Sequence, residues 1–141
     1  MKGPQGMKVL IDTNVILDVL CARKEFFEDS SKIWKCCESN KIKGYICALS
    51  VPNIVYILRK ELSPERTYEI ISQLFLIFKV VDLRSDDLKK AANLKFNDYE
   101  DAIQSICATR IKADFIVTRN IKDFINRKIH AIKPSNLLER V

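Results

Sequence analysis

Close to the N-terminus, a short apolar run at residues 8–11 ends in Asp12, Thr13 and Asn14. A buried strand of a parallel sheet is apolar almost throughout, and here a helical pattern follows the run at once. We therefore expect the run to form the first strand of an α/β sheet. Ligands of such sheets bind beyond the carboxyl ends of the strands. Asp12 is expected at that crevice, either as a helix cap or as a metal ligand and catalytic group.

The rest of the chain alternates between strand-like and helix-like patterns. Further strands are expected at 44–47, 79–82, 115–118 and 128–132. Helices are expected at 14–21, 26–37, 50–58, 63–78, 86–94, 97–112 and from 134 onward, with a short helical turn at 121–126. Ser50 or Val51 is expected near the N-cap of the third helix, with Pro52 in its first turn. The alternation implies right-handed crossovers, so the fold class is α/β. We expect a three-layer α/β/α sandwich around a central parallel sheet of four to five strands.

The size and composition of the chain fit one domain. Its 141 residues are 48% hydrophobic and 30% charged, which suffices to bury a core without disulfides. We expect residues 7–141 to form a single domain and residues 1–6 to be a tail or cloning remnant. No apolar run approaches the ~20 residues of a membrane span, and residues 1–6 lack the apolar core of a signal peptide. The five cysteines lack metal-site spacing, which indicates buried thiols and a cytoplasmic protein.

Positive charge is concentrated in the C-terminal part of the chain. The formal net charge is +6, and the segment from Arg110 to Val141 holds eight basic and three acidic residues, a surplus of five. A basic surface beside an acidic crevice suits a polyanionic substrate such as RNA. The alternative is an ordinary excess of solvated surface lysines and arginines.

Three polar segments are expected to lie near Asp12. Asp98 and Asp101 are three residues apart on one expected helix, so they share a face. Segment 118–124 directly follows the fourth strand, and segment 50–53 directly follows the second. Because the carboxyl ends of parallel strands meet at one edge of the sheet, the sequence predicts an acidic constellation there.

The chemistry of that constellation favours a divalent cation. Clustered carboxylates repel each other, and Mg²⁺ or Mn²⁺ relieves the repulsion through oxygen ligands. Such a metal assists hydrolysis of a phosphodiester. The chain has no paired Ser/His or Cys/His dyad, no Walker loop and no G-x-G-x-x-G motif. Metal-assisted phosphodiester hydrolysis is therefore the reaction that these residue types support best.

Each carboxylate also has a structural alternative. Asp12 could cap the helix that follows it. Asp98 could be an N-cap, with Asp101 at the third helical position. Asp123 could hold its own turn through a side-chain hydrogen bond. Their shared placement at strand ends and helix starts favours the catalytic interpretation.

Three motifs resemble the PIN-domain family of metal-dependent ribonucleases. They are Ile11-Asp12-Thr13-Asn14-Val15, Asp98-Tyr99-Glu100-Asp101-Ala102 and Val117-Thr118-Arg119-Asn120 with Asp123-Phe124. They stand in the order and spacing of the family, over about residues 7–138. The resemblance implies an endoribonuclease that uses Mg²⁺ or Mn²⁺. Many small bacterial members look like toxins of toxin–antitoxin pairs, so an antitoxin protein and a homodimer are the partners that it implies.

The resemblance also implies roles for individual residues. Asp12 and Asp101 match metal-binding positions, and Asp98 assists from the same helix face. The fourth acidic position is filled by Asn120 or Asp123, and Asp123 is a candidate metal ligand and catalytic residue. Residues expected to orient substrate or water are Asn14, Asn53, Thr118, Arg119 and Asn120.

Position 53 departs from the family pattern. The family usually has a glutamate at the start of the helix after the second strand, where this chain has Asn53. An amide adds no negative charge, so weaker metal binding is expected. This substitution supports a second hypothesis, a PIN domain that binds RNA or a protein without cutting. A third hypothesis, a phosphotransfer protein phosphorylated on Asp12, is disfavoured because the residue two positions later is Asn14 rather than a second aspartate.

Overall fold

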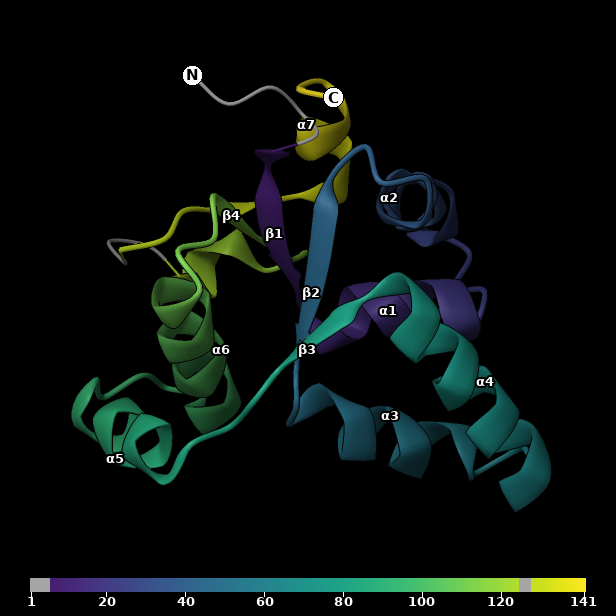
Figure 1. The fold of residues 1–141 in the computed structure, drawn as a ribbon, viewed down its shortest axis with the longest axis horizontal. Helices are drawn as coiled ribbons and strands as arrows, with labels where there is room; N and C mark the ends of the chain where they lie inside the picture. Colours follow the sequence, from purple (N-terminus) through teal and green to yellow (C-terminus); the bar gives the residue numbers. More distant parts are fainter. Residues whose placement is uncertain (1–5, 125–127) are drawn as a thin grey trace.

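Five parallel strands form one sheet in the computed structural model, which describes residues 6–124 and 128–141 (Figure 1). The strands are β1 (Lys8–Ile11), β2 (Lys43–Cys47), β3 (Lys79–Val81), β4 (Phe115–Val117) and β5 (Ala131–Ile132). Their order across the sheet is β3-β2-β1-β4-β5, and every neighbouring pair is parallel. β1 is therefore central, and its carboxyl end lies between the carboxyl ends of β2 and β4.

Helices cover both faces of this sheet (Figure 1). They are α1 (Thr13–Leu20), α2 (Phe27–Glu38), α3 (Ser50–Leu58), α4 (Pro64–Ile77), α5 (Ser85–Asn93), α6 (Tyr99–Arg110), α7 (Pro134–Leu138) and the 3₁₀ turn η2 (Ile121–Phe124). In Figure 1, α5 and α6 lie on one side of the sheet, and α1 to α4 lie on the other. The predicted α/β/α sandwich is confirmed.

The side chains of β1 explain the layers. Val9 and Ile11 point into one hydrophobic cluster, which includes residues of α1, α2, α3, α4 and α7. Leu10 points into a second cluster, formed with residues of α5 and α6. All three side chains are at most 1% exposed. A strand buried on both faces must be apolar at successive positions, which is why the sequence of β1 is recognisable.

Several boundaries differ from those expected. α3 begins at Ser50 with Leu49 as its N-cap residue, so Ser50 and Val51 lie next to the cap as expected, and no side chain caps this helix. The Ser50 hydroxyl instead contacts Thr13 and Gln104. β5 covers only the last two residues of the expected strand 128–132. Residues 125–126 of the expected helical turn, like residues 1–5 of the tail, lie outside the described residues. Within the described ranges, no helix is both long and apolar enough to cross a membrane.

Candidate active site

Asp12 lies directly beyond the carboxyl end of β1, and its carboxylate is held by β4. The hydroxyl of Thr118 donates to Asp12 Oδ2 at 3.0 Å, and the backbone N–H of Asn120 donates to the same hydroxyl at 3.2 Å. Asp12 is only 8% exposed and Thr118 is fully buried. Although Asp12 is the N-cap residue of α1, its side chain makes no capping hydrogen bond. The carboxylate is thus held by the side chain of Thr118, which directly follows β4.

Burial raises the pKa of Asp12. The hydrogen bonds from Thr118 and the backbone of Thr13, and the charge of Arg119, act in the opposite direction but do not outweigh burial. The negative charge of Asp98 adds to the rise. Asp12 therefore sits where a nearby positive charge would strongly favour its ionised form.

The start of α6 brings a second group of carboxylates to Asp12. Asp98 is the N-cap, and its Oδ1 accepts from the backbone N–H groups of Glu100 and Asp101 at 2.8 and 3.2 Å. The structural alternative for Asp98 is thereby confirmed. Asp101, at the third helical position, is partly buried. Burial, followed by the charges of Asp98, Asp12 and Asp123, raises the pKa of Asp101 to about 7.

Asp123 reaches this group from η2. Its side chain shares a hydrogen bond with that of Asp101, which also raises the pKa of Asp101. Its backbone N–H donates to the carbonyl oxygen of Asn120 at 3.1 Å and holds the turn. The turn is therefore closed by the backbone, and no described hydrogen bond of the Asp123 side chain holds it.

These residues line a common cavity of about 250 Å³. The lining residues are Asp12, Thr13, Asn14, Leu17, Asn53, Tyr56, Ile57, Glu100, Asp101, Gln104, Asn120 and Asp123. A smaller cavity adjoins it and shares Asp101 and Asp123. Lys95 and Lys122 line that second cavity, so two cations stand on the far side of the carboxylate pair.

The structure brings Glu100 to the position where the sequence lacks an acid. The amide of Asn53 donates to Glu100 Oε1 at 3.2 Å across the cavity, from α3 to α6. Sequence reasoning missed Glu100 because one helical turn alone does not show which residue faces α3. Its position next to Asp101 was the available signal.

Gln104 is a second residue that sequence reasoning missed. It is 3% exposed, and its amide Nε2 donates to Ser50 Oγ at 3.3 Å, which in turn lies 2.6 Å from Thr13 Oγ1. Gln104 Oε1 is buried without a hydrogen-bond partner among the described atoms. Gln104 follows Asp101 by three residues on α6, and this spacing predicts a shared face. A buried unpaired oxygen in a polar cavity is a position for a ligand or water.

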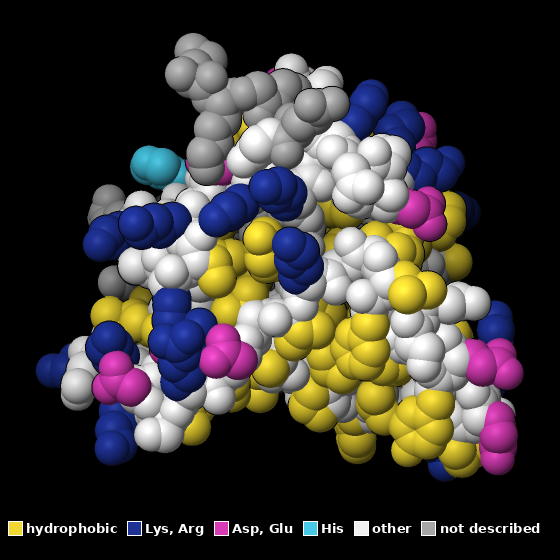
Figure 2. Space-filling model, in the orientation of Figure 1, with side chains coloured by type: hydrophobic (Ala, Val, Ile, Leu, Met, Phe, Trp, Pro, Cys, Tyr) yellow, Lys and Arg dark blue, Asp and Glu magenta, His cyan; other side chains and the backbone are white. Residues whose placement is uncertain are grey.

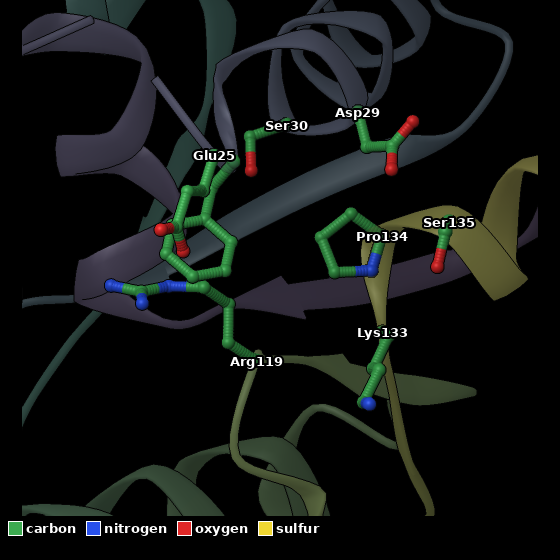
Figure 3. A pocket seen from close by; sticks show the side chains of 8 residues that line it. Glu25, Asp29, Ser30, Arg119, Lys133, Pro134 and Ser135 are labelled. Carbon is green, nitrogen blue, oxygen red and sulfur yellow. The ribbon is translucent and has the colours of Figure 1, made fainter. Parts of the chain in front are cut away.

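Arg119 does not line the cavity that Asp12, Asp101 and Asp123 share. Its Nε is 3.1 Å from Asp18 Oδ2, and its guanidinium lies 4.0 Å from the centre of the Phe26 ring. It lines a different pocket, together with Glu25, Lys133 and other residues (Figure 3). The other expected positions, Asn14, Asn53 and Asn120, line the carboxylate cavity. Thr118 acts on the cavity through Asp12.

The cavity suits a hard divalent cation with an incomplete protein shell. Among the described residues, no three His, Cys, Asp or Glu side chains are already arranged to hold a metal. Mg²⁺ usually binds through one or two carboxylates and keeps several waters. Asp12 and Asp101 are separate oxygen donors of this kind, and the unpaired oxygen of Gln104 offers an acceptor to a water. The donor chemistry of the cavity therefore fits a partly hydrated Mg²⁺ or Mn²⁺.

These features define a class of protein. It is a parallel α/β sandwich with an acidic cavity at the carboxyl edge of its sheet. A family model described as "PIN domain" matches residues 8–122. The chain belongs to the PIN-domain family, as its sequence motifs indicate. A comparison with curated protein sequences gave no match.

Solved structures share this fold. DNA-bound VapBC from Salmonella typhimurium is similar with a TM-score of 0.69 and 17% identity, over 91% of this chain and 98% of that one. A toxin–antitoxin complex from Klebsiella pneumoniae gives 0.68 and 19%, over 89% and 97%. VapBC2 from Rickettsia felis, bound to a promoter DNA fragment, gives 0.67 and 14%, over 90% and 98%. At these identities the similarity establishes the fold alone.

Proposed function

We propose that this protein is a metal-dependent endoribonuclease, formed by residues 7–141 as one domain. The observation that carries the proposal is the convergence of Asp12 and Asp101 on one cavity, where burial and then the charges of Asp98, Asp12 and Asp123 raise the pKa of Asp101 to about 7. Carboxylates that oppose each other's ionisation are stabilised by a cation. Membership of the PIN-domain family supports a nuclease.

Asp12 and Asp101 would hold the Mg²⁺ or Mn²⁺ ion, with Thr118 fixing Asp12. When bound, the ion polarises the phosphodiester and activates water. Asp123 is exposed and hydrogen-bonded to Asp101. We propose that Asp123 accepts the proton that the attacking water releases. Asn14, Asn53 and Asn120 orient water or substrate within the cavity.

Phosphates of the RNA would be bound by cations around the site. Lys95 and Lys122 line the cavity that adjoins the carboxylates, and we assign them to phosphates on either side of the cleaved bond. The C-terminal segment, with its surplus of five positive charges, extends this surface. The guanidinium group of Arg119 forms an ion pair with Asp18. We therefore propose that Arg119 orients the substrate through its charge at long range.

We also propose that the protein is the toxin of a toxin–antitoxin pair. The similar structures are described as VapBC and as a toxin–antitoxin complex, which supports an antitoxin partner. We propose a homodimeric toxin on the family resemblance alone. All five cysteines are free thiols, which supports the cytoplasm as its compartment.

RNA cleavage tests this proposal. Mixed-sequence, end-labelled RNA would be incubated with the wild type in Mn²⁺ or in EDTA, beside Asp12→Asn, Asp101→Asn and the surface control Glu65→Gln. We expect Mn²⁺-dependent cutting by the wild type and Glu65→Gln, and loss of cutting in the two site variants with an unchanged circular dichroism spectrum. Cutting by the wild type in EDTA, or by Asp12→Asn, would overturn the proposal.

One observation favours a second candidate function, a binding module without catalysis. Asn53 supplies an amide where an acid is expected, and it is hydrogen-bonded to Glu100. A wild type that is inert in both Mg²⁺ and Mn²⁺ but still binds RNA or a partner protein would establish this alternative.

A further inference from the structure

The cavity that the carboxylates line also has apolar lining residues. Leu17 of α1 and Ile57 of α3 line it together with Tyr56, which is 69% exposed. We propose that this apolar part of the lining is a subsite for one unpaired RNA base, which stacks on the ring of Tyr56 while the neighbouring phosphate lies at the carboxylates. The inference rests on the proposed function and specifies its substrate as RNA with an unstacked base beside the cleaved bond.

Tyr56 has the surroundings of a stacking platform. An exposed aromatic ring at the mouth of a polar cavity offers one face to a base, and this interaction is tolerant of base identity. The ammonium group of Lys60, which follows the C-terminal end of α3, lies 5.1 Å from the centre of the Tyr56 ring. A cation next to the ring is placed to bind the phosphate of the stacked nucleotide.

The side-chain amides of two residues that line the cavity have fixed orientations. Arg23 Nη1 donates to Asn14 Oδ1 at 3.2 Å, so the amino group of Asn14 remains as a donor. Asn53 donates its amino group to Glu100 at 3.2 Å, so its carbonyl oxygen remains as an acceptor. The exposed edge of an unpaired base carries both donors and acceptors. The cavity therefore offers hydrogen bonds to a base whose face rests on Tyr56.

Gln104 supplies an independent indication of a ligand. Its Oε1 is buried in the lining of this cavity and has no partner among the described atoms, although its amino group is engaged by Ser50. Such an oxygen costs free energy unless a ligand or an ordered water donates to it. A ribose hydroxyl or an amino group of the bound nucleotide has the required donor.

Protein binding is the alternative use of Tyr56. Hydrophobic side chains gather over α3 and α4 (Figure 2), and Tyr68, Phe75 and Leu76 of α4 are exposed there. Tyr56 differs from these three because it lines the carboxylate cavity and has a lysine against its ring. This difference favours RNA as the ligand of Tyr56.

A double-mutant cycle tests the subsite without requiring catalysis. Fluorescence anisotropy would measure binding of labelled single-stranded RNA of ~8 nucleotides to the full chain in EDTA at low salt. The proteins are the wild type, Tyr56→Phe, Tyr56→Ala and the control Tyr68→Ala, an exposed tyrosine on α4. Each is measured with intact RNA and with RNA carrying an abasic nucleotide at each position in turn.

We expect Tyr56→Ala to weaken binding of intact RNA at least about fivefold, while Tyr56→Phe and Tyr68→Ala bind like the wild type. One abasic position should weaken wild-type binding by a similar factor and leave Tyr56→Ala unaffected. Additive effects at every position, or equal losses in Tyr56→Ala and Tyr68→Ala, would overturn the inference. So would a change of oligomeric state in Tyr56→Ala with unchanged RNA binding, because it would assign the ring to a protein interface. If the cycle holds but Mn²⁺ produces no cutting, the subsite stands and the nuclease proposal fails.

Discussion

The side-chain amide of Asn53 donates a hydrogen bond to the carboxylate of Glu100 over 3.2 Å, and this contact joins α3 to α6 across the cavity. The pair places a negative charge close to the position where family resemblance implies a glutamate. Because the amide holds the carboxylate of Glu100, the site has an acid on that side even though residue 53 is neutral. Asn53 and Glu100 should therefore act as a unit.

Glu100→Gln tests this unit. We expect the substitution to weaken Mn²⁺ binding roughly tenfold, the size of effect typical of residues that support metal ligands. Isothermal titration calorimetry measures the affinity directly, and Glu65→Gln, at an exposed glutamate in the first turn of α4, is the matched control. An unchanged Mn²⁺ affinity in Glu100→Gln would show that Glu100 plays no part in metal binding.

The raised pKa of Asp101 predicts a pH dependence of stability without metal. The pKa is about 7 in the folded protein, above the ordinary value of 3.8, so folding favours the protonated acid. Its stabilising contribution is fully present below pH ~4 and is lost as the pH rises through about 7. We expect Tm in EDTA to fall on the order of 3 °C between pH 5 and pH 8.

Asp101→Asn should flatten this profile, because the amide does not titrate. Asp12, whose pKa is also raised by burial, keeps a slope of the same sign. A Tm of the wild type that rises from pH 5 to pH 8, or a profile unchanged in Asp101→Asn, would contradict the assignment. Added Mn²⁺ should remove the loss at pH 8, since it binds the ionised carboxylate.

Asp87 does not line the cavity, and we expect its substitution to lower the free energy of unfolding. It is 3% exposed, accepts the backbone N–H of Arg84 at 2.9 Å and pairs with Arg110 at 2.8 Å. Burial acts to raise its pKa, but these hydrogen bonds and the arginine charges outweigh burial and lower it. We expect Asp87→Ala to reduce the free energy of unfolding by about 2 kcal/mol, because it removes the buried one of the two carboxylates that pair with Arg110, the other being the exposed Asp82, and leaves the backbone N–H of Arg84 without its acceptor.

Urea denaturation measures this loss, and the adjacent Asp86 supplies the control. Asp86 pairs with Lys90 at 3.0 Å, but both side chains are more than 60% exposed, 67% and 63% respectively. Asp86→Ala should therefore cost less than about 1 kcal/mol. Equal losses in the two variants would refute the distinction between a buried and an exposed ion pair.

Gly44 lies in β2, and we expect a larger residue at this position to clash with its neighbours. A Cβ atom at this position would lie 2.6 Å from Cys37 Sγ and 2.8 Å from Phe78 Cδ1, shorter than van der Waals contact. We expect Gly44→Ala to cost about 1–3 kcal/mol of unfolding free energy. In a double-mutant cycle, Cys37→Ala should recover part of that cost, because it removes the closest atom. Strict additivity of the two substitutions would exclude the clash.

The order of the secondary structure could be predicted because local patterns determine it. β1 is buried on both faces and is apolar at every inward position. Ser63 and Pro64 mark the start of α4, where Ser63 Oγ accepts the backbone N–H of Arg66 at 3.2 Å. Asp98 caps α6 in the same way. Each of these signals lies within a few residues of the feature that it predicts.

Contacts between distant segments account for what the sequence did not predict. Ser50 has the residue type of a helix cap, yet its hydroxyl is 2.6 Å from Thr13 Oγ1, 37 positions away in the chain. Glu100 contacts Asn53 across 47 positions. Arg119 follows a strand at the correct edge of the sheet, but Asp18 and Phe26 hold it in a different pocket. Local spacing carries no information about such partners.

The order of the strands in the sheet determines when the candidate active site can form during synthesis of the chain. Asp12 is held by Thr118, 106 positions later, and β1 reaches its neighbour β4 only after most of the polypeptide has been synthesised. A chain still emerging from the ribosome therefore carries Asp12 without the partners that orient it. If the protein cuts RNA, that activity is withheld from the nascent chain until β4 has left the ribosome and paired with β1.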